Sequence, residues 1–425
     1  MNIQSTADLA LQIMLEKGFD DAQVSADLRK RNMLSFHDDE VSVMRSGETH
    51  KLNLIGIIDG RRASADLGDL KEDSIHAAAE RLFASASAAP QDVANAVSSN
   101  ERAQITRGPQ ECESELLARK VGELLDFRNT ETPRAHLNEG SCSYTHNTRR
   151  VLSSRGSDLV SNIGYYSLDT YVVAREGVHV SSANGASGNC EDIAAKHAAD
   201  WFDIGRILRE TEAQLYPQGI DKGFIGDVIL TPGAFDAVLE WLLGHLKDIH
   251  LIANTSVYRN RIGEQIASPL FSVRSHFDGT GNCPITADAF NAPPITVVEN
   301  GKLNSLLPSL YASRKTGVKH VPTLATGWSV DSGNTPLDDM ISGVRHGALV
   351  NYLSMGIPAS NGDFSAVIKC SSLIDNGAIG PALTGVMMTG NIGKLLQDIM
   401  EISVERIDYG FVALPWIKAA NLHFS

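Results

Sequence analysis

The sequence predicts an α+β fold with two domains, an N-terminal helix-and-sheet domain followed by a mostly antiparallel β C-terminal domain. The 425 residues exceed the usual length of one domain, and 43% hydrophobic with 21% charged residues is ordinary globular composition. Helical apolar spacing is concentrated in the first half, whereas short alternating segments between turn signals dominate the second. Pro217 and Gly219 punctuate the chain, so we place the domains at 1–215 and 216–425.

Cap and turn residues set the elements expected in the first domain. Ser5 is expected to cap a helix that Gly18 closes. Asp59-Gly60 is a type I′ hairpin signal between alternating segments, and Pro90 stops an Ala-rich helix. The expected elements are a helix at 5–16, strands at 40–47 and 50–58, a helix at 74–89, a loop at 90–110, a helix at 114–127, strands over 135–188 and a helix at 191–212.

The second domain is expected to be a curved antiparallel sheet or open barrel with one central helix packed on it. A strand at 226–232 leads into that helix at 232–250. Asn300-Gly301 and Asn376-Gly377 are two further hairpin signals. A short helix at 392–402 and a last strand at 410–420 complete the expected fold.

Charge and cysteine usage exclude several classes of function. Lys+Arg 37 against Asp+Glu 51 gives a net charge of −14, which disfavours binding to a nucleic acid. The sequence contains no apolar run long enough for a membrane helix, and its first residues lack a secretory pattern. The five cysteines, at 112, 142, 190, 283 and 370, form no CxxC. We therefore expect free thiols and a cytoplasmic location, with neither nucleic acid nor membrane as a partner.

Several segments, in their order and spacing, resemble the TldD/PmbA family, also called the DNA gyrase modulator or TldE group. The resemblance extends over nearly the whole chain and ends in a PmbA-type C-terminal segment. The segments are VSVMRSGE (41–48), IDGRRASADL (58–67), SSRG (153–156), GHL (244–246), SVYRNRIGEQIASPL (256–270), VVENGKLNSLLPSLYASRKTG (297–317), MTGNI (388–392) and GFVALPWIKAA (410–420).

The resemblance implies a subunit of a two-subunit cytosolic zinc metalloprotease. In this family the TldD-type subunit carries an HExxxH zinc helix and a distal Cys ligand, while the TldE-type subunit lacks them and completes the chamber. The pair is associated with trimming unfolded or precursor peptides, including peptide-antibiotic precursors. For this chain the resemblance implies a TldD-like partner in a heterodimer, a homodimer when isolated, an extended peptide substrate, and zinc in the partner but no cofactor of its own.

The zinc motif is degenerate in this sequence. The matching frame runs from Glu240 to His245 and keeps only the last histidine. Glu240 is a weak ligand candidate, but Trp241 cannot replace the glutamate base. His245 and His250 repeat the five-residue step, yet they lie about 140° apart on a regular helix and need a local distortion to share a metal. The last segment also lacks the distal cysteine.

Other side chains carry weaker hypotheses. His276, Asp278 and Cys283 are potential ligands, although we interpret HFDGTGNC as a polar turn. The alternative for SVYRNR (256–261) is a solvated loop with Tyr258 packed over it, and the segment 313–315 has the same alternative of a solvated segment. The candidates for peptide or partner contact are His245, Tyr258, Arg259, Arg261, Ser313 and Arg314, of which the arginines suit a carboxylate.

The leading hypothesis is a TldE-like subunit without a zinc site of its own. One alternative is an active metallopeptidase that uses Glu240, His245 and either Cys283 or Cys370. The other is a protein-binding regulator of the gyrase-modulator type, because the negative charge disfavours DNA contact but not protein contact.

Overall fold

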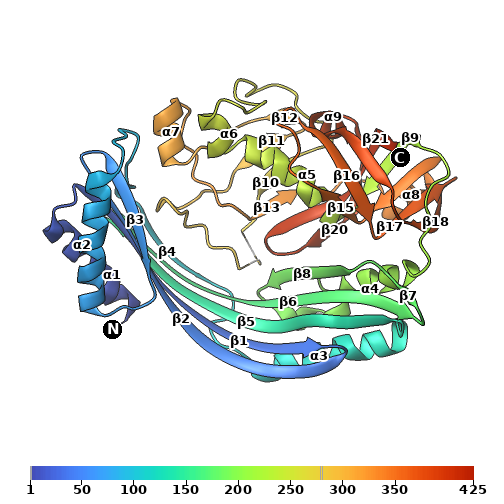
Figure 1. Cartoon of the computed structure of the whole chain (residues 1–425), viewed down its shortest axis with the longest axis horizontal. Coiled ribbons are helices and arrows are strands. Elements are labelled where there is room, and N and C mark those ends of the chain that lie inside the picture. Colours follow the sequence, from blue (N-terminus) through green and yellow to red (C-terminus); the bar gives the residue numbers. More distant parts are fainter. Residues whose placement is uncertain (1, 278, 280) are drawn as a thin grey trace.

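Two β-sheets and the helices packed on them form the molecule (Figure 1). The computed structural model describes residues 2–277, 279 and 281–425. The first sheet has the order β3-β2-β1-β5-β6-β4, with β7 and β8 also pairing with β6. Most of its pairs are antiparallel, but β4 runs parallel to β6. The strands are β1 (Asp21–His37), β2 (Glu40–Ile58), β3 (Arg61–Leu67), β4 (Arg102–Arg107), β5 (Ala135–Ser153), β6 (Asp158–Glu176), β7 (His179–Val180) and β8 (Asn184–Cys190).

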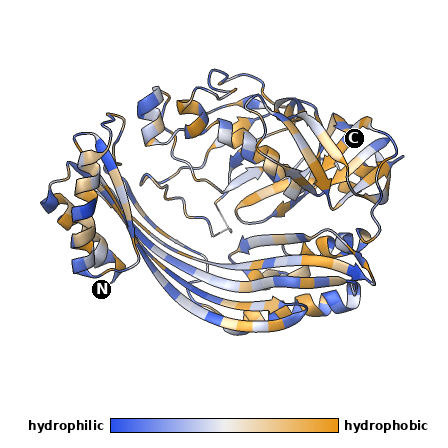
Figure 2. Cartoon of the chain, in the orientation of Figure 1, coloured by the Kyte–Doolittle hydropathy of each residue, from blue (hydrophilic) through white to orange (hydrophobic). Residues whose placement is uncertain are grey.

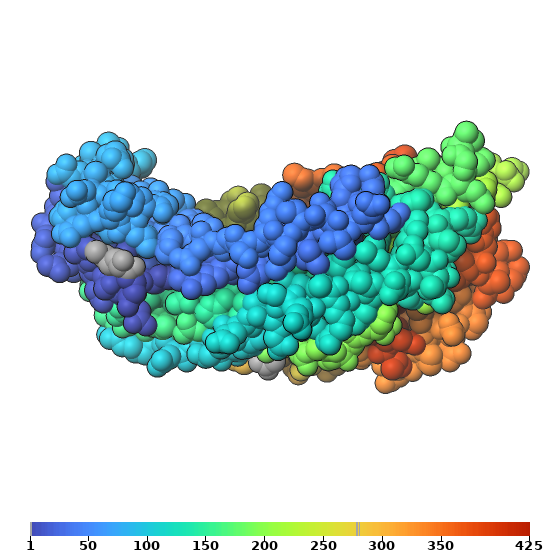
Figure 3. Space-filling model, turned by 90° about the horizontal axis from the view of Figure 1, so that it is seen from below, coloured from blue at the N-terminus to red at the C-terminus, as the bar shows by residue number. Residues whose placement is uncertain are grey.

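The long strands of this sheet span the molecule. Hydrophilic and hydrophobic residues alternate along them, as expected where the two faces meet different surroundings (Figure 2). Seen from below, the blue N-terminal segment covers a continuous strip along much of the molecule (Figure 3). The predicted hairpin at Asp59-Gly60 is confirmed, because both residues have the positive φ of 48° and 70° that a type I′ turn requires.

Helices pack at both ends of the first sheet (Figure 1). α1 (Ile3–Lys17) and α2 (Glu72–Ala88) form one core with the start of the sheet, and α3 (Ser114–Glu131) and α4 (Ile204–Ala213) pack at the other end. Gly18 closes α1 as predicted, with φ 99°. The predicted cap was wrong: the Asn2 side chain accepts from the Ser5 backbone N–H at 2.9 Å, so Asn2 is the cap.

Two other expectations for the first half were wrong. The segment at 90–110 is not all loop, because β4 adds in parallel to β6, a long-range pairing that local sequence does not encode. The helix at 191–212 is interrupted. Two 3₁₀ turns, Ile193–Ala195 and Ala198–Asp200, precede α4. Phe202 and Asp203 have φ of 53° and 66°, a left-handed conformation that an α-helix cannot contain.

The second sheet is mixed, because most of its strand pairs are antiparallel but β14 runs parallel to β9; the predicted α+β fold class is confirmed. Its long strand β21 (Val412–Phe424) pairs with β9, β19 and β20, and it runs parallel to β13. The other strands are β9 (Phe224–Leu230), β10 (Val273–Ser275), β11 (Thr296–Glu299), β12 (Lys302–Leu303), β13 (Trp328–Val330), β14 (His346–Val350), β15 (Tyr352–Met355), β16 (Asp363–Lys369), β17 (Ser371–Asp375), β18 (Ala378–Leu383), β19 (Met387–Asn391) and β20 (Ile399–Asp408).

Both predicted hairpins of this half are confirmed, with Asn300-Gly301 joining β11 to β12 and Asn376-Gly377 joining β17 to β18. The expected helix at 392–402 is shorter, because its last residues form β20. The helices of this half are α5 (Pro232–His245), α6 (Asp248–Ile252), α7 (Leu310–Thr316), α8 (Leu337–Ser342) and α9 (Ile392–Gln397).

The main hydrophobic core joins both halves of the chain. It contains Leu34 and Leu168 from the first sheet together with Leu230 and Ile417 from the second. The division near residue 215 remains a prediction, because this core continues across it. Among the described residues, no helix is both long and apolar enough to span a bilayer.

Candidate functional site

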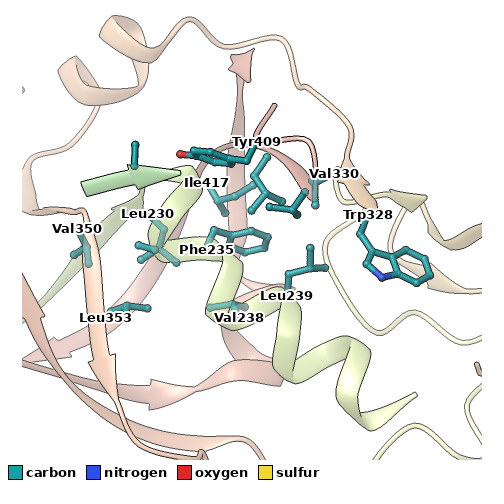
Figure 4. Packing of buried hydrophobic residues seen from close by; sticks show 14 of the residues in the cluster. Leu230, Phe235, Val238, Leu239, Trp328, Val330, Val350, Leu353, Tyr409 and Ile417 are labelled. Atoms are coloured by element: carbon teal, nitrogen blue, oxygen red, sulfur yellow. The ribbon is translucent and has the colours of Figure 1, made fainter. Parts of the chain in front are cut away.

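The helix that corresponds to the zinc helix is held rigidly on the second sheet. Thr231 caps α5 by accepting from the Ala234 backbone N–H at 3.3 Å, and Pro232 occupies the first helical turn. Phe235, Val238 and Leu239 pack into the core beside strand residues (Figure 4). The end of α5 is therefore fixed in position by its own apolar face.

The expected helix at 232–250 is broken at the end of this motif. α5 ends at His245 and α6 begins at Asp248. The Ser256 hydroxyl donates to the His245 carbonyl at 2.5 Å, which satisfies a helix-end acceptor. The break stacks the His245 and His250 rings, whose centroids lie 3.9 Å apart with an angle of 14° between the planes. The local distortion that the sequence required for such a pair is thus present.

His245 is buried and neutral. Its Nδ1 accepts from the Val257 backbone N–H at 3.4 Å, so Nε2 carries the proton. Burial and the neighbouring His250 lower the pKa of His245 to about 4. Among the described residues, its Nε2 finds no hydrogen-bond partner.

Trp241 stands where HExxxH has its base. The indole lies 4.3 Å from the His245 ring and 6.0 Å from the Tyr258 ring, centroid to centroid. We call Trp241, His245 and Tyr258 the aromatic cluster. Glu240, by contrast, is exposed on the helix surface, whereas His245 is buried. An indole supplies neither a proton-accepting base nor a metal ligand, so the residues at this position do not fit a catalytic zinc ion.

The ligand sets proposed from the sequence are not assembled. Among the described residues, no group of three His, Cys, Asp or Glu side chains is placed to hold a metal ion. The Cys370 thiol is buried against the Ala183 carbonyl, and burial raises its pKa to about 11. His276 pairs with Asp408 at 2.8 Å. Cys283 is partly buried, and Asp278 lies outside the described residues.

The contact candidates after α6 are held within their own loop. Tyr258 is buried, and this burial raises its pKa to about 12. Arg259 donates to the Leu251 carbonyl at 2.8 Å, and Arg261 donates to Glu264 at 2.8 Å. Their role in peptide or partner contact remains a prediction.

Ser313 and Arg314 lie on α7, which contacts the N-terminal part of the same chain. Arg314 donates to the Val93 carbonyl at 2.8 Å, and Lys315 pairs with Asp92 at 2.7 Å. The Lys315 hydrogen bond is the largest cause that lowers the pKa of Asp92 to about 2. We call these contacts the α7 latch. The latch borders a 590 Å³ cleft between the two halves, a feature that the sequence did not reveal.

A second pocket, of 430 Å³, lies beside α6, and one of its lining residues, His250, stacks on His245 of the aromatic cluster. It collects ionisable side chains from three distant segments: Lys247, Asp248 and His250, then Asp288, then His320. We call it the His320 pocket. Sequence reasoning missed it because only the KDIH run (247–250) is local, and nothing in the spacing brings 288 and 320 beside it.

Comparison with known proteins identifies the C-terminal half of the chain. Residues 225–425 match the family model described as the PmbA/TldA metallopeptidase C-terminal domain. This match covers a little under half of the chain, and it places these residues in that family's C-terminal domain. Relatives with 22% identity are a metalloprotease of Methanothermobacter thermautotrophicus, over 276 residues and 61% of each chain, and a zinc metalloprotease TldD homolog of Saccharolobus solfataricus, over 278 residues, 60% of this chain and 61% of the relative. The chain thus spans about three fifths of these relatives' length.

Solved structures of the TldD/PmbA group share the fold over nearly the full chain. TldE from Thermococcus kodakarensis superposes with a TM-score of 0.85 at 19% identity, covering 99% of this chain and 100% of that one. A candidate modulator of DNA gyrase from Bacteroides thetaiotaomicron gives 0.85 at 17% identity, covering 99% and 98%. These likenesses show the architecture, and the site must be argued from this chain's own residues.

Proposed function

We propose that this chain is the TldE/PmbA-like, non-catalytic subunit of a cytoplasmic TldD/TldE-type zinc metalloprotease that processes unfolded or precursor peptides. Trp241 carries the proposal. It occupies the position of the catalytic base and packs its indole on His245. A TldD-like partner is expected to supply the zinc helix, with this chain completing the chamber.

The free edge of the first sheet supports binding of an extended peptide. β3 pairs with β2 only from Leu52 onward, so the segment 41–51 pairs on one side with β1. Val41, Val43 and Met44 are exposed there, and the edge carries no proline. Such an edge accepts another strand through its backbone groups and needs little side-chain specificity.

Reconstitution tests the proposal. The chain is purified alone and together with a TldD-like subunit, and hydrolysis of an unfolded peptide is followed with and without a chelator. We expect chelator-sensitive hydrolysis only from the pair, and a stable heterodimer in gel filtration. Hydrolysis by the lone chain that both a chelator and His245→Ala abolish would refute the proposal. Capture of a topoisomerase in place of a protease subunit would favour the regulator alternative.

A further inference from the structure

The His320 pocket has the features of a binding site that are missing from the aromatic cluster. It is open, has a volume of 430 Å³ and lies between α6 and the segments around Leu307 and Pro322. α6 and α7 lie together at the top of Figure 1, on the side of the molecule that faces α1 and α2. The pocket shares Asp288, Ser309 and Thr323 with the 590 Å³ cleft between the two halves, so a ligand can reach it from there.

The carboxylates of the pocket are already used by the protein. Asp248 accepts from the Ser309 backbone N–H at 2.8 Å and from its hydroxyl at 2.5 Å. Asp288 accepts from the Thr286 hydroxyl at 2.6 Å and from the Leu310 backbone N–H at 2.8 Å. These bonds hold the start of α7 and use part of the acceptor capacity of each carboxylate.

The hydrogen-bond donors of the pocket, in contrast, are not all used by the protein. The Lys247 ammonium carries three N–H donors and, within the described residues, donates one hydrogen bond, to the Ala325 carbonyl at 3.3 Å. His250 uses Nδ1 with the Thr255 hydroxyl at 2.9 Å, which leaves Nε2. His320 Nε2 lies 3.5 Å from Asp288 Oδ2, and this contact helps to lower the pKa of the carboxyl, so His320 is not counted among the spare donors. Spare donors around one cavity favour an anionic ligand.

The remaining wall is apolar. Leu307 is buried at its base, and Val321, Pro322 and Leu324 continue the surface. Ile249 projects at the rim with 80% of its surface exposed. An apolar wall beside spare cationic donors suits a ligand that carries an anionic head and an apolar side chain.

We infer that the His320 pocket binds the free C-terminal carboxylate of a peptide whose last side chain is apolar. Lys247 and His250 bind the carboxylate, and the wall at 321–324 receives the side chain. The inference rests on the proposed function only for the source of the peptide, since the binding belongs to this chain alone. It gives the subunit a substrate-selecting role: it recognises the end of a chain that the partner cleaves.

Titration of the full-length chain with acetyl-Ala-Ala-Leu tests the inference. The probes are the free acid, its C-terminal amide and acetate, and affinity is measured by calorimetry. We expect the acid to bind at least about tenfold more tightly than the amide, because the amide removes the charge-assisted hydrogen bonds. Acetate is expected to bind more weakly than the acid, since it lacks the apolar side chain.

Lys247→Met removes the ammonium and is expected to reduce acid binding to the level of the amide. Lys302→Met, at an exposed lysine in β12, is the matched control and should leave acid binding unchanged. Equal binding of acid and amide by the unaltered chain overturns the inference, whatever the folding of the variant. So does undiminished acid binding by folded Lys247→Met, or acetate binding as tight as that of the acid.

The same samples separate this inference from the proposed function. If no heterodimer forms but the acid still binds selectively, the proposed function fails and the pocket assignment holds. If the heterodimer forms while acid and amide bind alike, the pocket assignment fails and the proposed function holds.

Discussion

The aromatic cluster and the His320 pocket, which meet where His250 stacks on His245, differ in the way their polar groups are used. The aromatic cluster is buried, and the pKa of His245 is lowered to about 4, so that His245 stays neutral. The His320 pocket, in contrast, is open and keeps spare donors on Lys247 and His250. Trp241 and His245, which fall within the degenerate zinc motif, are buried in the core, while the spare donors lie in the adjoining pocket. The comparison predicts that substitutions in the cluster affect stability and that substitutions in the pocket affect binding.

The largest expected effect comes from Trp241→Ala. The side chain is 9% exposed and packs on two rings of the cluster, so its removal leaves a cavity. We expect a loss of about 3–5 kcal/mol in the free energy of unfolding. Urea denaturation measures it, with Val93→Ala at an exposed site as the control, expected within about 0.5 kcal/mol of the unaltered protein. A loss below about 1 kcal/mol would mean that the cluster is not part of the core.

The pH dependence of stability is the next largest effect. Because the folded pKa of His245 is about 4 against an ordinary 6.5, the unfolded chain binds more protons between these values. Stability from this group is present in full above about pH 6.5 and is lost as the pH falls toward 4, by at most about 3 kcal/mol. His245→Gln should flatten the unfolding free energy over this window. An unchanged slope in the variant would place the titration elsewhere.

The hairpins, the Gly18 end of α1 and the start of the core helix could be predicted from the sequence, because their signals are local. Asp59-Gly60, Asn300-Gly301 and Asn376-Gly377 need a positive φ, and their residue types tolerate it. The break at Phe202 and Asp203 could not be predicted, since neither residue favours a left-handed conformation as glycine does. Tertiary packing imposes it.

The candidate site likewise has features that the sequence predicts and features that it does not. The loss of the zinc motif can be seen in the sequence, because Glu240 and Trp241 lie in the same six-residue motif as the retained His245. The stacking of His245 on His250 depends on a helix break between them, which the continuous apolar pattern concealed. The His320 pocket and the α7 latch join segments separated by tens to hundreds of residues, so no sequence spacing predicts them.

A smaller effect tests the contrast between the aromatic cluster and the His320 pocket. Ile249→Ala changes an exposed side chain at the pocket rim, so the free energy of unfolding should stay within about 0.5 kcal/mol. The same change should weaken binding of acetyl-Ala-Ala-Leu by a few-fold, about the effect of one or two buried methylene groups, but not binding of acetyl-Ala-Ala-Gly. Calorimetry with both peptides measures the difference. Equal weakening of both would show that Ile249 does not contact the last side chain.

The smallest expected effect concerns the α7 latch. Asp92→Asn removes the ion pair with Lys315 and should speed hydrogen exchange in α7, with little change in global stability. Asp20→Asn, at an exposed aspartate outside the latch, serves as the control. Because Asp92 has a pKa of about 2 in the folded protein, the contribution of its charge to the latch should be lost only as the pH falls below its ordinary value of 3.8 toward 2. Exchange in α7 that is the same in both variants would show that the latch does not restrain the helix.

The central claim is that this chain has lost its own zinc site and acts with a partner. The most direct test is the zinc content of the singly expressed chain, measured by elemental analysis after gel filtration. The account predicts near-zero zinc per chain, with zinc appearing only when a TldD-like subunit is present. About one zinc per chain in the lone protein, lost in His245→Ala, would contradict it and make this chain a metallopeptidase with a new set of ligands.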